Sequence, residues 1–472
     1  MTGDRPDNAP GIERTPTLID GMDTILGGGL VRGAAYIVQG PPGAGKTILS
    51  NQICFNHTGN GGTALYVSLL AESHDRMMAY MRQMAFYAPD RVPEMLHYIS
   101  AYGALQSEGL GGVLKLMLQE IRRRKATLIV LDGLFVINDA AGGEGAFRRF
   151  VHEMQAQAAI TRSTILMLTN QSRSPTSPEH TMVDGWIELT DDDHGLRAVR
   201  SLIVHKQRGS DFMRGRHFFR ISDEGIRIFP RVEIAFDSHH AGHPDEAPLS
   251  SGIEALDDML GGGYPSRSVT LLKGPTGIGK TSFGLHFLSR ATAAEPGLMV
   301  SFFETPAQLA AKGSAIGLET VKAVENGALH LLWFAPAEEL IDEILHAAIA
   351  TVERTGAKRV FFDGLTALKG LMLYNGRLPL AINAMNRRLR DLGATIVYAQ
   401  ESSCLHLPND LGGDDLFGIV DNLLLLHYVS EAGQLHHNMT ILKLRDASHD
   451  IVPNPFKMTC NGVSFQHQRR KV

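Results

Sequence analysis

The chain is poor in cysteine and tryptophan, and neither sign of charge is in strong excess. Its three cysteines are scattered over 472 residues, and none forms a Cys-x-x-Cys pair. This spacing argues against a disulfide framework or a zinc cage and fits a reducing cytosol. The net charge of −5 gives no electrostatic case for general binding to nucleic acid or membranes. We therefore do not expect nucleic acid or a membrane among the partners.

Long hydrophobic runs are also missing. No apolar run is long enough to span a bilayer, and the polar stretch 1–10 lacks a hydrophobic signal segment. We therefore expect a soluble, cytoplasmic protein. The hydrophobic content of 44% and the charged content of 20% are ordinary for a globular protein. A chain of 472 residues suits two domains, each able to bury its own core.

Glycine, by contrast, is abundant, and it marks the most informative pattern. The phosphate-binding pattern G-x-x-x-x-G-K-[ST] occurs twice, 234 residues apart. Its glycines let backbone N–H groups converge on phosphate oxygens, its lysine neutralises the β/γ-phosphates, and its threonine can ligand Mg²⁺. We predict that both loops bind ATP. The predicted ATP-binding residues are Gly40, Pro41, Pro42, Gly43, Ala44, Gly45, Lys46, Thr47 and Ile48, and Gly274, Pro275, Thr276, Gly277, Ile278, Gly279, Lys280, Thr281 and Ser282.

Features beyond the loops recur in the same order. An apolar run ends at Asp132 in the first half and at Asp363 in the second, and a Lys-x-Arg sequence follows at 206–208 and at 443–445. The offsets between these paired features are 234, 231 and 237 residues. Because each repeat is domain-sized, this period indicates a duplicated domain rather than a solenoid.

Apolar strands alternate with helical segments in both halves, as in the expected strands 35–39, 64–69 and 164–169. This alternation predicts an α/β fold with a largely parallel sheet covered on both faces. A polar β-hairpin follows near 183–205, with its turn expected at 191–195. The expected divisions are a flexible leader at 1–14, a first domain at 15–236, a linker at 237–247, a second domain at 248–465 and a short basic tail at 466–472.

Two aspartates are candidate metal ligands. A carboxylate at the end of a buried strand near a P-loop is where Mg²⁺ is usually held. Asp132 with Thr47, and Asp363 with Thr281, are therefore predicted to bind Mg²⁺. The alternative is that each aspartate caps the helix that follows.

Hydrolysis also needs a group that orients or deprotonates water. We predict that Glu72 and Glu304 serve, because each follows a strand that we expect to lie beside the P-loop strand. The alternative is a surface glutamate that opens a helix and complements its dipole.

The repeated Lys-x-Arg sequence supplies two cations to one face of a strand, because side chains two apart point the same way. We predict that Lys206, Arg208, Lys443 and Arg445 act with the P-loop lysines in catalysis. Cations from a neighbouring subunit commonly stabilise the charge of phosphoryl transfer.

Polar residues end the strand that follows each aspartate strand. They are Asn170 and Gln171 in the first half and Gln400 and Glu401 in the second. Such side chains can sense the γ-phosphate, although a helix cap or a turn residue explains them nearly as well.

Together these residues resemble the KaiC family, within the RecA/RadA-like P-loop ATPases. The resemblance implies two tandem RecA-like P-loop domains in a double-ring hexamer, with ATP bound between subunits and Lys-x-Arg reaching across each interface. The segments that carry it, beside the first P-loop, are Arg14-Thr15-Pro16, Leu26-Gly27-Gly28-Gly29-Leu30, Lys206-Gln207-Arg208-Gly209 and the stretch 221–230.

The chain departs from the family pattern at two places. KaiC proteins carry paired glutamates after the second strand, whereas this chain has Leu70-Ala71-Glu72 and Phe303-Glu304. The clock protein is phosphorylated on an adjacent Ser-Thr pair, and the matching positions here, Phe417 and Gly418, carry no hydroxyl.

We therefore predict an oligomeric ATPase that signals to a protein partner through its nucleotide-dependent conformation. A serine/threonine autokinase of the circadian-clock type is the alternative, and Ser402, Ser403 and Thr440 remain as acceptors. A RecA/RadA-like DNA-dependent ATPase is a further alternative, against which the acidic balance and the duplicated domain stand.

Overall fold

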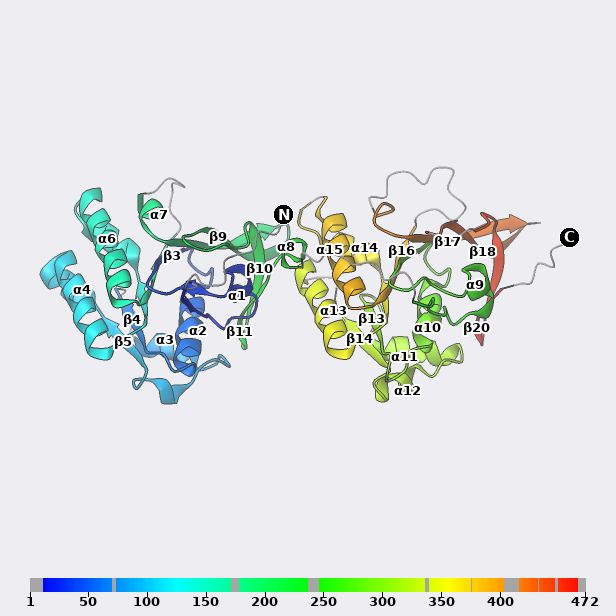
Figure 1. Ribbon diagram of the computed structural model, residues 1–472, viewed down its shortest axis with the longest axis horizontal. Helices are drawn as coiled ribbons and strands as arrows, with labels where there is room; N and C mark the ends of the chain where they lie inside the picture. Colours follow the sequence, from blue (N-terminus) through cyan, green and yellow to red (C-terminus); the bar gives the residue numbers. More distant parts are fainter. Residues whose placement is uncertain are drawn as a thin grey trace. The chain divides into compact units, whose positions relative to one another are not determined.

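The computed structural model describes residues 12–69, 74–170, 178–236, 246–335, 339–374, 376–402, 416–431, 433–445 and 449–465. The chain divides into two compact units, residues 1–231 and 232–472 (Figure 1). Each unit is built around one nine-stranded sheet.

The sheet of the first unit has the order β11-β10-β9-β8-β3-β7-β6-β4-β5. The strands from β5 to β8 run parallel, and β9, β10 and β11 continue the sheet as antiparallel neighbours. A small ladder of β1 and β2 stands apart from this sheet. The strands are β1 (Arg14–Thr15), β2 (Leu30–Val31), β3 (Ala35–Gln39), β4 (Ala64–Ser68), β5 (Leu96–Ser100), β6 (Leu128–Asp132), β7 (Thr164–Thr169), β8 (Gly185–His194), β9 (Arg197–Gln207), β10 (Arg216–Ser222) and β11 (Gly225–Phe229).

The second unit repeats this order as β14-β13-β15-β16-β12-β17-β18-β19-β20. Its parallel part runs from β14 to β17, and its antiparallel part begins with the hairpin of β17 and β18. The predicted fold class, two tandem RecA-like α/β domains, is therefore confirmed. The strands are β12 (Val269–Gly274), β13 (Gly297–Ser301), β14 (Leu329–Trp333), β15 (Arg359–Asp363), β16 (Thr395–Glu401), β17 (Asn422–Glu431), β18 (Gln434–Lys443), β19 (Asn454–Thr459) and β20 (Gly462–Phe465).

Helices cover both faces of each sheet. In the first unit α4, α5 and α6 pack on one face, and α1, α2 and α3 pack on the other. The helices of this unit are α1 (Met22–Ile25), α2 (Lys46–Gly59), α3 (His74–Met81), η1 (Pro89–Arg91), α4 (Tyr102–Arg124), α5 (Leu134–Ala140), α6 (Glu144–Thr161) and α7 (Pro178–Met182). Those of the second are α8 (Val232–Ala235), α9 (Glu254–Met259), α10 (Lys280–Ser289), α11 (Pro306–Ala315), α12 (Thr320–Glu325), α13 (Ile341–Thr355), α14 (Leu365–Gly370) and α15 (Arg377–Asp391).

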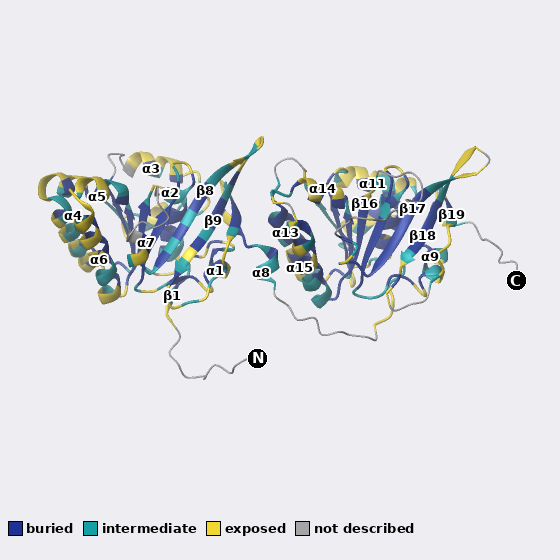
Figure 2. Ribbon diagram, turned by 90° about the horizontal axis from the view of Figure 1, so that it is seen from above, coloured by how far each residue is buried: buried dark blue, intermediate teal, exposed yellow. Residues whose placement is uncertain are grey.

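The strand sequences explain why both faces are covered. In β3, Ala35 and Ile37 face the α4–α6 side while Tyr36 and Val38 face the α2 side, and all four are buried. A strand that is apolar at every position must be enclosed on both sides, which is the usual state of a parallel strand. Figure 2 shows the same division, with buried strands inside and exposed residues on the outer side of α4.

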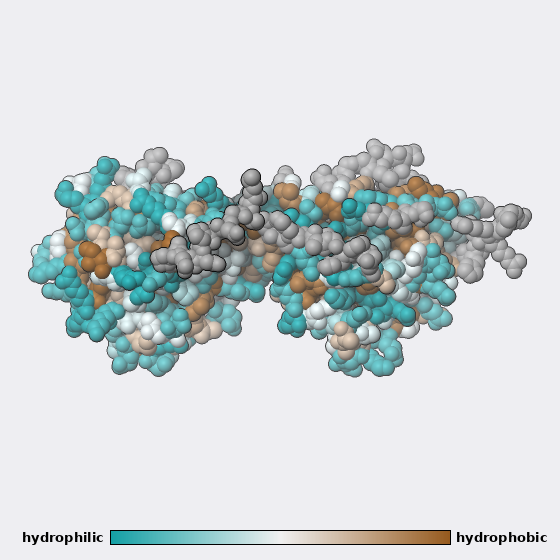
Figure 3. Space-filling view, viewed as in Figure 1, coloured by the Kyte–Doolittle hydropathy of each residue, from teal (hydrophilic) through white to brown (hydrophobic). Residues whose placement is uncertain are grey.

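The surface agrees with this burial. On the face that Figure 3 shows, hydrophilic residues predominate in both units and hydrophobic ones form small groups. Among the described residues, no helix combines the length and the apolar character that crossing a membrane requires.

The hairpin of the first unit differs from the expectation. The structure carries β8 through His194, so residues 191–194 lie in the strand and the turn falls after them. The aspartates of this run have cationic partners across the sheet: Asp191 pairs with Arg200 at 3.2 Å, and Asp192 pairs with Arg216 at 2.6 Å. Cross-strand charge pairs stabilise an extended conformation that the aspartates alone do not favour.

Helix α8 packs within the second unit, although its residues were expected to close the first domain. Arg377, at the start of α15, binds two carboxylates at once. Its guanidinium contacts Glu233 of α8 at 2.7 Å and Asp342 of α13 at 2.6 Å. Asp342 is fully buried, so its charge depends on this arginine.

We predict that Arg377→Met destabilises the second unit by about 3–5 kcal/mol, because a buried carboxylate then loses its partner. The matched control is Arg388→Met on the same helix. Arg388 pairs with Glu353 at the surface, where such pairs contribute up to about 1 kcal/mol. Denaturant unfolding measures the free energy of unfolding of both variants. Equally small decreases in the two variants would contradict the predicted contribution of Arg377.

Candidate functional site

Both phosphate-binding loops join the carboxyl end of a central parallel strand to the start of a helix. The first loop lies between β3 and α2, and the second lies between β12 and α10. Each contains glycines in the left-handed region: Gly43 and Gly45 have φ of 86° and 98°, and Gly277 and Gly279 have 81° and 106°. Residues with a Cβ rarely adopt these angles, so the glycines allow the turn that aims backbone N–H groups into the loop.

The loop lysines fold back over their own loops. Lys46 donates from Nζ to the carbonyl of Gly40 at 2.6 Å, and Lys280 donates to Gly274 at 2.9 Å. Burial lowers the pKa of both lysines, and the nearby carboxylates oppose that shift. Each ammonium group therefore lies at the centre of its loop, where a phosphate would contact it.

The second unit brings the predicted metal ligands together. The Thr281 hydroxyl donates to Oδ2 of Asp363 at 2.9 Å. Burial raises the pKa of Asp363, and the Thr281 hydrogen bond acts against that shift. A carboxylate and a hydroxyl beside a phosphate-binding loop are oxygen donors of the kind that Mg²⁺ prefers, so these residues fit the metal.

The first unit holds its aspartate differently. Asp132 ends β6 and accepts a hydrogen bond at 2.7 Å from the hydroxyl of Tyr66, a fully buried residue of β4. A second phenol, that of Tyr98, donates to Asn51 at 2.7 Å, and Asn51 in turn donates to the carbonyl of Thr47 at 2.8 Å. Polar side chains thus hydrogen-bond to both predicted magnesium ligands of this unit: Tyr66 to the Asp132 carboxylate, and Asn51 to the Thr47 carbonyl.

The second unit has apolar residues at the corresponding places. Leu285 lies five residues after the P-loop lysine, as Asn51 does in the first unit. Met299 and Leu331 are the third residues of β13 and β14, where Tyr66 and Tyr98 stand in β4 and β5. From the sequence alone, no role was assigned to Tyr66. The feature that could have pointed to it is a phenol among the apolar residues Ala64, Leu65 and Val67 of β4.

A cavity of about 540 Å³ lies over the second loop. Lys280, Thr281, Asp363 and Glu304 all line it. Glu304 forms an ion pair with Lys312 of α11 through Oε1, and its Oε2 is buried without a hydrogen-bond partner among the described residues. The structure therefore brings Glu304 to the loop, whereas Glu72 lies outside the described residues.

The expectation that Glu72 and Glu304 follow strands beside the P-loop strands is wrong. The strands that precede them, β4 and β13, do not lie beside the P-loop strands: β7 and β6 separate β4 from β3, and β16 and β15 separate β13 from β12. The chain leaves each P-loop strand by a crossover that skips two places, which later strands fill. Glu304 reaches the cavity beside the aspartate strand instead, since Ser301 pairs with Asp363.

Two strands flank the second P-loop strand, β16 and β17, and β16 ends in Glu401. This residue lies opposite Gly274, accepts a hydrogen bond from Thr276 at 3.3 Å, and lines the same cavity as Glu304. Its charge also acts on the pKa of Lys280, as expected for a near neighbour. Asn170 stands after the matching strand of the first unit, and Gln171 lies outside the described residues.

The Lys-x-Arg cations of the first unit lie toward the amino edge of the sheet. Lys206 pairs with Trp186, which pairs with Ile37 of β3. Lys206 and Arg208 both donate to the carbonyl of Thr181, at 3.0 and 3.2 Å. The P-loop follows the opposite end of β3, so these cations point away from the loop of their own unit.

The second unit repeats the arrangement. Lys443 pairs with Leu423, which pairs with Leu271, and its Nζ donates to the carbonyl of Val420 at 2.6 Å. Arg445 contacts Asp421 at 2.9 Å. Both Lys-x-Arg pairs therefore lie at the edge of their sheet opposite to their own P-loop.

The fold and the two loops define a tandem P-loop ATPase. The family model described as "ATPase: KaiC" matches residues 15–233 and 249–470, and the chain belongs to this family. Among curated proteins, the chain is similar to the circadian clock oscillator protein KaiC of Picosynechococcus sp., with 24% identity over 98% of this chain and 91% of the relative. It is also similar to the circadian clock oscillator protein KaiC of Nostoc sp., with 23% identity over 98% and 90%.

The support beneath Asp132 gives a test. In a Lys280→Ala background, which leaves the first site to be measured, Tyr66→Phe keeps the ring and removes the donor. We predict that the Mg²⁺ concentration for half-maximal nucleotide binding rises about tenfold, because groups that orient a metal ligand contribute that much to metal affinity. A Mg²⁺ titration with a fluorescent ATP analogue measures it. Tyr36→Phe, which removes a phenol bonded to Val31, is the control, and equal behaviour of both variants would contradict the role of Tyr66.

Proposed function

We propose that this chain assembles into a homo-oligomeric ring, a hexamer, that binds and hydrolyses Mg-ATP between subunits. The observation that carries the proposal is the placement of each Lys-x-Arg pair at the sheet edge opposite to its own P-loop. A ring is built from heterologous contacts, in which one edge of a subunit meets the other edge of the next. Such contacts bring Lys443 and Arg445 of one subunit to the ATP held by the next subunit's second loop.

The residues at each loop divide the work of phosphoryl transfer. Loop N–H groups and Lys46 or Lys280 hold the phosphates, and Thr47 with Asp132, or Thr281 with Asp363, would hold Mg²⁺. The bound metal supplies charge neutralisation on the phosphoryl oxygens. The cations of the neighbouring subunit add to it as charge develops, and positioning of this kind is the main contribution that P-loop proteins make to the reaction.

Water is the nucleophile in this proposal. Glu304 orients it in the second unit, since its carboxylate lines the cavity that contains Lys280 and Asp363. Lys312 fixes one oxygen of Glu304 and leaves the other to accept from water. Glu401 lines the same cavity from the P-loop side, where it accepts a hydrogen bond from Thr276 and lies near the expected position of the γ-phosphate. Glu72 has the corresponding role in the first unit.

The autokinase alternative lacks a suitable acceptor where the clock protein has one. Residues 416–419 read Leu-Phe-Gly-Ile, and Lys443 lies beside them, with Nζ 3.4 Å from the Phe417 carbonyl. None of these side chains can attack phosphorus. ATP turnover then changes the conformation of the ring without modifying the chain covalently. In this proposal, a protein partner recognises the changed conformation. The relatives named as clock oscillator proteins are consistent with a signalling role.

The first test concerns the nucleophile. In a Lys46→Ala background, Glu304→Gln should lower turnover by roughly 10²–10⁴-fold, as expected for the loss of a general base, while ATP binding persists. Glu401→Gln should change turnover less than Glu304→Gln. Phosphate release and nucleotide binding are measured together, with Glu353→Gln, a surface change on α13, as the control. Near-normal turnover of Glu304→Gln would show that another group positions the water.

The second test concerns action between subunits. Every subunit carries Lys46→Ala. One pool also carries Lys280→Ala, and the other carries Lys443→Ala with Arg445→Ala. Each pool alone should be nearly inactive, whereas random mixing of subunits gives about a quarter of the interfaces an intact loop and intact cations from different chains.

We therefore predict that mixing and reassembly restore about a quarter of the Lys46→Ala rate. Light scattering should show rings in both pools, which separates assembly from activity. If the mixed rings stayed inactive, the assignment of the cations to the neighbouring subunit's site would be overturned. A strict monomer with full activity would overturn the ring itself.

A further inference from the structure

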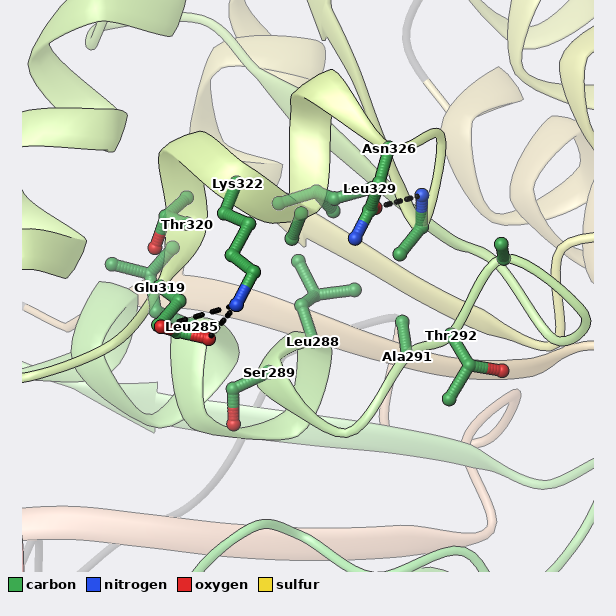
Figure 4. Close-up of a pocket in the computed structure, with 13 residues that line it drawn as sticks. Leu285, Leu288, Ser289, Ala291, Thr292, Glu319, Thr320, Lys322, Asn326 and Leu329 are labelled. Carbon is green, nitrogen blue, oxygen red and sulfur yellow. Dashed lines mark hydrogen bonds and ion pairs between the residues drawn. The ribbon is translucent and has the colours of Figure 1, made fainter.

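Two routes lead away from each phosphate-binding loop: the helix that follows it and the residue that precedes it. The helix of the second unit ends among groups that satisfy each other. Figure 4 shows Lys322 beside Glu319 near the end of α10, where the two charges pair at 3.2 Å. The residues that precede the loops, Gln39 and Lys273, lead elsewhere. In both units their route ends at the lysine of the Lys-x-Arg pair.

In the first unit the route begins at Gln39, the last residue of β3. Its amide donates from Nε2 to Glu188 at 3.3 Å and accepts at Oε1 from Nε2 of His180 at 2.8 Å. The hydrogen bond from His205 lowers the pKa of Glu188, and an ionised carboxylate can only accept. The amide nitrogen therefore faces Glu188, and the His180 ring must donate to the amide oxygen. Gln39 and His180 are 3% and 5% exposed, so loss of this hydrogen bond would leave a buried polar group unpaired.

His180 carries the route to the cations through its backbone. Its carbonyl accepts from Nζ of Lys206 at 3.1 Å. The next carbonyl, that of Thr181, accepts from Lys206 at 3.0 Å and from Arg208 at 3.2 Å. The His180 ring also stacks on Trp186, with centroids 3.8 Å apart and planes inclined by 6°. The P-loop strand thus holds the ring of His180, and the carbonyl of the same residue holds Lys206.

The second unit builds the same route from different chemistry. Lys273 stands directly before its loop, as Gln39 does, and its ammonium group lies 4.7 Å from the centroid of the Phe417 ring. The Phe417 carbonyl accepts from Nζ of Lys443 at 3.4 Å. A cation over an aromatic face is an attractive contact, so it takes the place of the amide–imidazole hydrogen bond. The two units connect the same positions with different side chains, which indicates that the connection itself matters.

We propose that His180 and Phe417 are positioning residues for the neighbouring subunit's ATP site, and that Gln39 and Lys273 tie them to the P-loop of their own subunit. The inference rests on the proposed function, in which the cations serve a neighbour. A contact that fixes the carbonyl beside a lysine also fixes its ammonium group, and a misplacement of about 1 Å can cost on the order of 10²-fold in rate. The position of the loop that holds one ATP therefore bears on the cations that are offered to the next.

Mixed rings locate the effect. Every subunit carries Lys280→Ala, so that only the first sites turn over. Pool one also carries Lys206→Ala with Arg208→Ala and keeps an intact loop, whereas pool two carries Lys46→Ala and keeps intact cations. All activity of the mixed rings then comes from interfaces at which the loop of pool one meets the cations of pool two.

His180→Phe keeps a ring on Trp186 and removes the donor to Gln39. In pool two it should lower the rate of the mixed rings by roughly 10–100-fold while ATP binding persists. In pool one it should leave the rate unchanged, because the cations there are already gone. No loss from pool two, or an equal loss from either pool, would overturn the inference alone. Parent mixed rings without activity would overturn the proposed action between subunits and this inference with it.

His205→Phe is the matched control. His205 also stacks on Trp186, with centroids 4.0 Å apart, but its Nε2 bonds to Glu188. In pool two this variant should leave the rate unchanged, and a loss equal to that of His180→Phe would overturn the role of Gln39. Light scattering checks that the rings assemble. If His180→Phe does not assemble, Gln39→Leu removes the same hydrogen bond from the strand side and should lower the rate from pool two alone.

The second unit suggests a rescue. Gln39→Lys combined with His180→Phe in pool two rebuilds the contact of Lys273 with Phe417 in the first unit. The double variant should recover most of the rate that His180→Phe alone removes. A double variant as slow as the single one would overturn the equivalence of the two routes.

Discussion

The parallel alignment of the central strands is the constraint on which the rest of each unit depends. Parallel strands bring their carboxyl ends to one edge, so the loop after β12, Asp363 at the end of β15 and Glu401 at the end of β16 meet there. The antiparallel hairpin reverses direction and carries the Lys-x-Arg cations to the other edge. One sheet therefore separates the groups that hold a nucleotide from the cations that would serve a neighbour.

The two units satisfy the same phosphate chemistry with different supports. Hydroxyl and amide groups of Tyr66, Tyr98 and Asn51 lie beneath the first loop, whereas apolar side chains lie beneath the second. A buried polar network must be fully hydrogen-bonded to be tolerated, and when it is, it fixes geometry closely. In the second unit the Thr281 hydroxyl orients Asp363, so one predicted metal ligand positions the other. In the first site a buried core residue, Tyr66, orients the aspartate, whereas in the second site the other predicted ligand, Thr281, does so.

The sequence predicted the parts of the site that depend on local pattern. Loop glycines at positive φ and aspartates at strand ends follow from spacing. The placement of both cations of each Lys-x-Arg pair on one strand was wrong, because β9 and β18 end before Arg208 and Arg445, which lie past their strands. Strand order does not follow from spacing, because an apolar strand reads the same wherever it lies in a sheet. The expected neighbours of the P-loop strands were therefore wrong, and Glu401 was undervalued. Tyr66 escaped notice because its function depends on a contact with Asp132, 66 residues away.

Duplication explains which features the halves share and which they do not. The phosphate-binding loop tolerates little change, because it needs glycine at defined φ angles and a lysine at its centre. The far end of the following helix carries no such requirement, so Phe55 in one unit and Ser289 in the other are both compatible with the fold. Leu285 and Leu288 keep α10 packed in the second unit, and Ile53 and Cys54 do the same for α2 in the first. A helix whose first turn is fixed by the phosphate-binding loop can therefore differ in its last turn without disturbing the nucleotide site at its start.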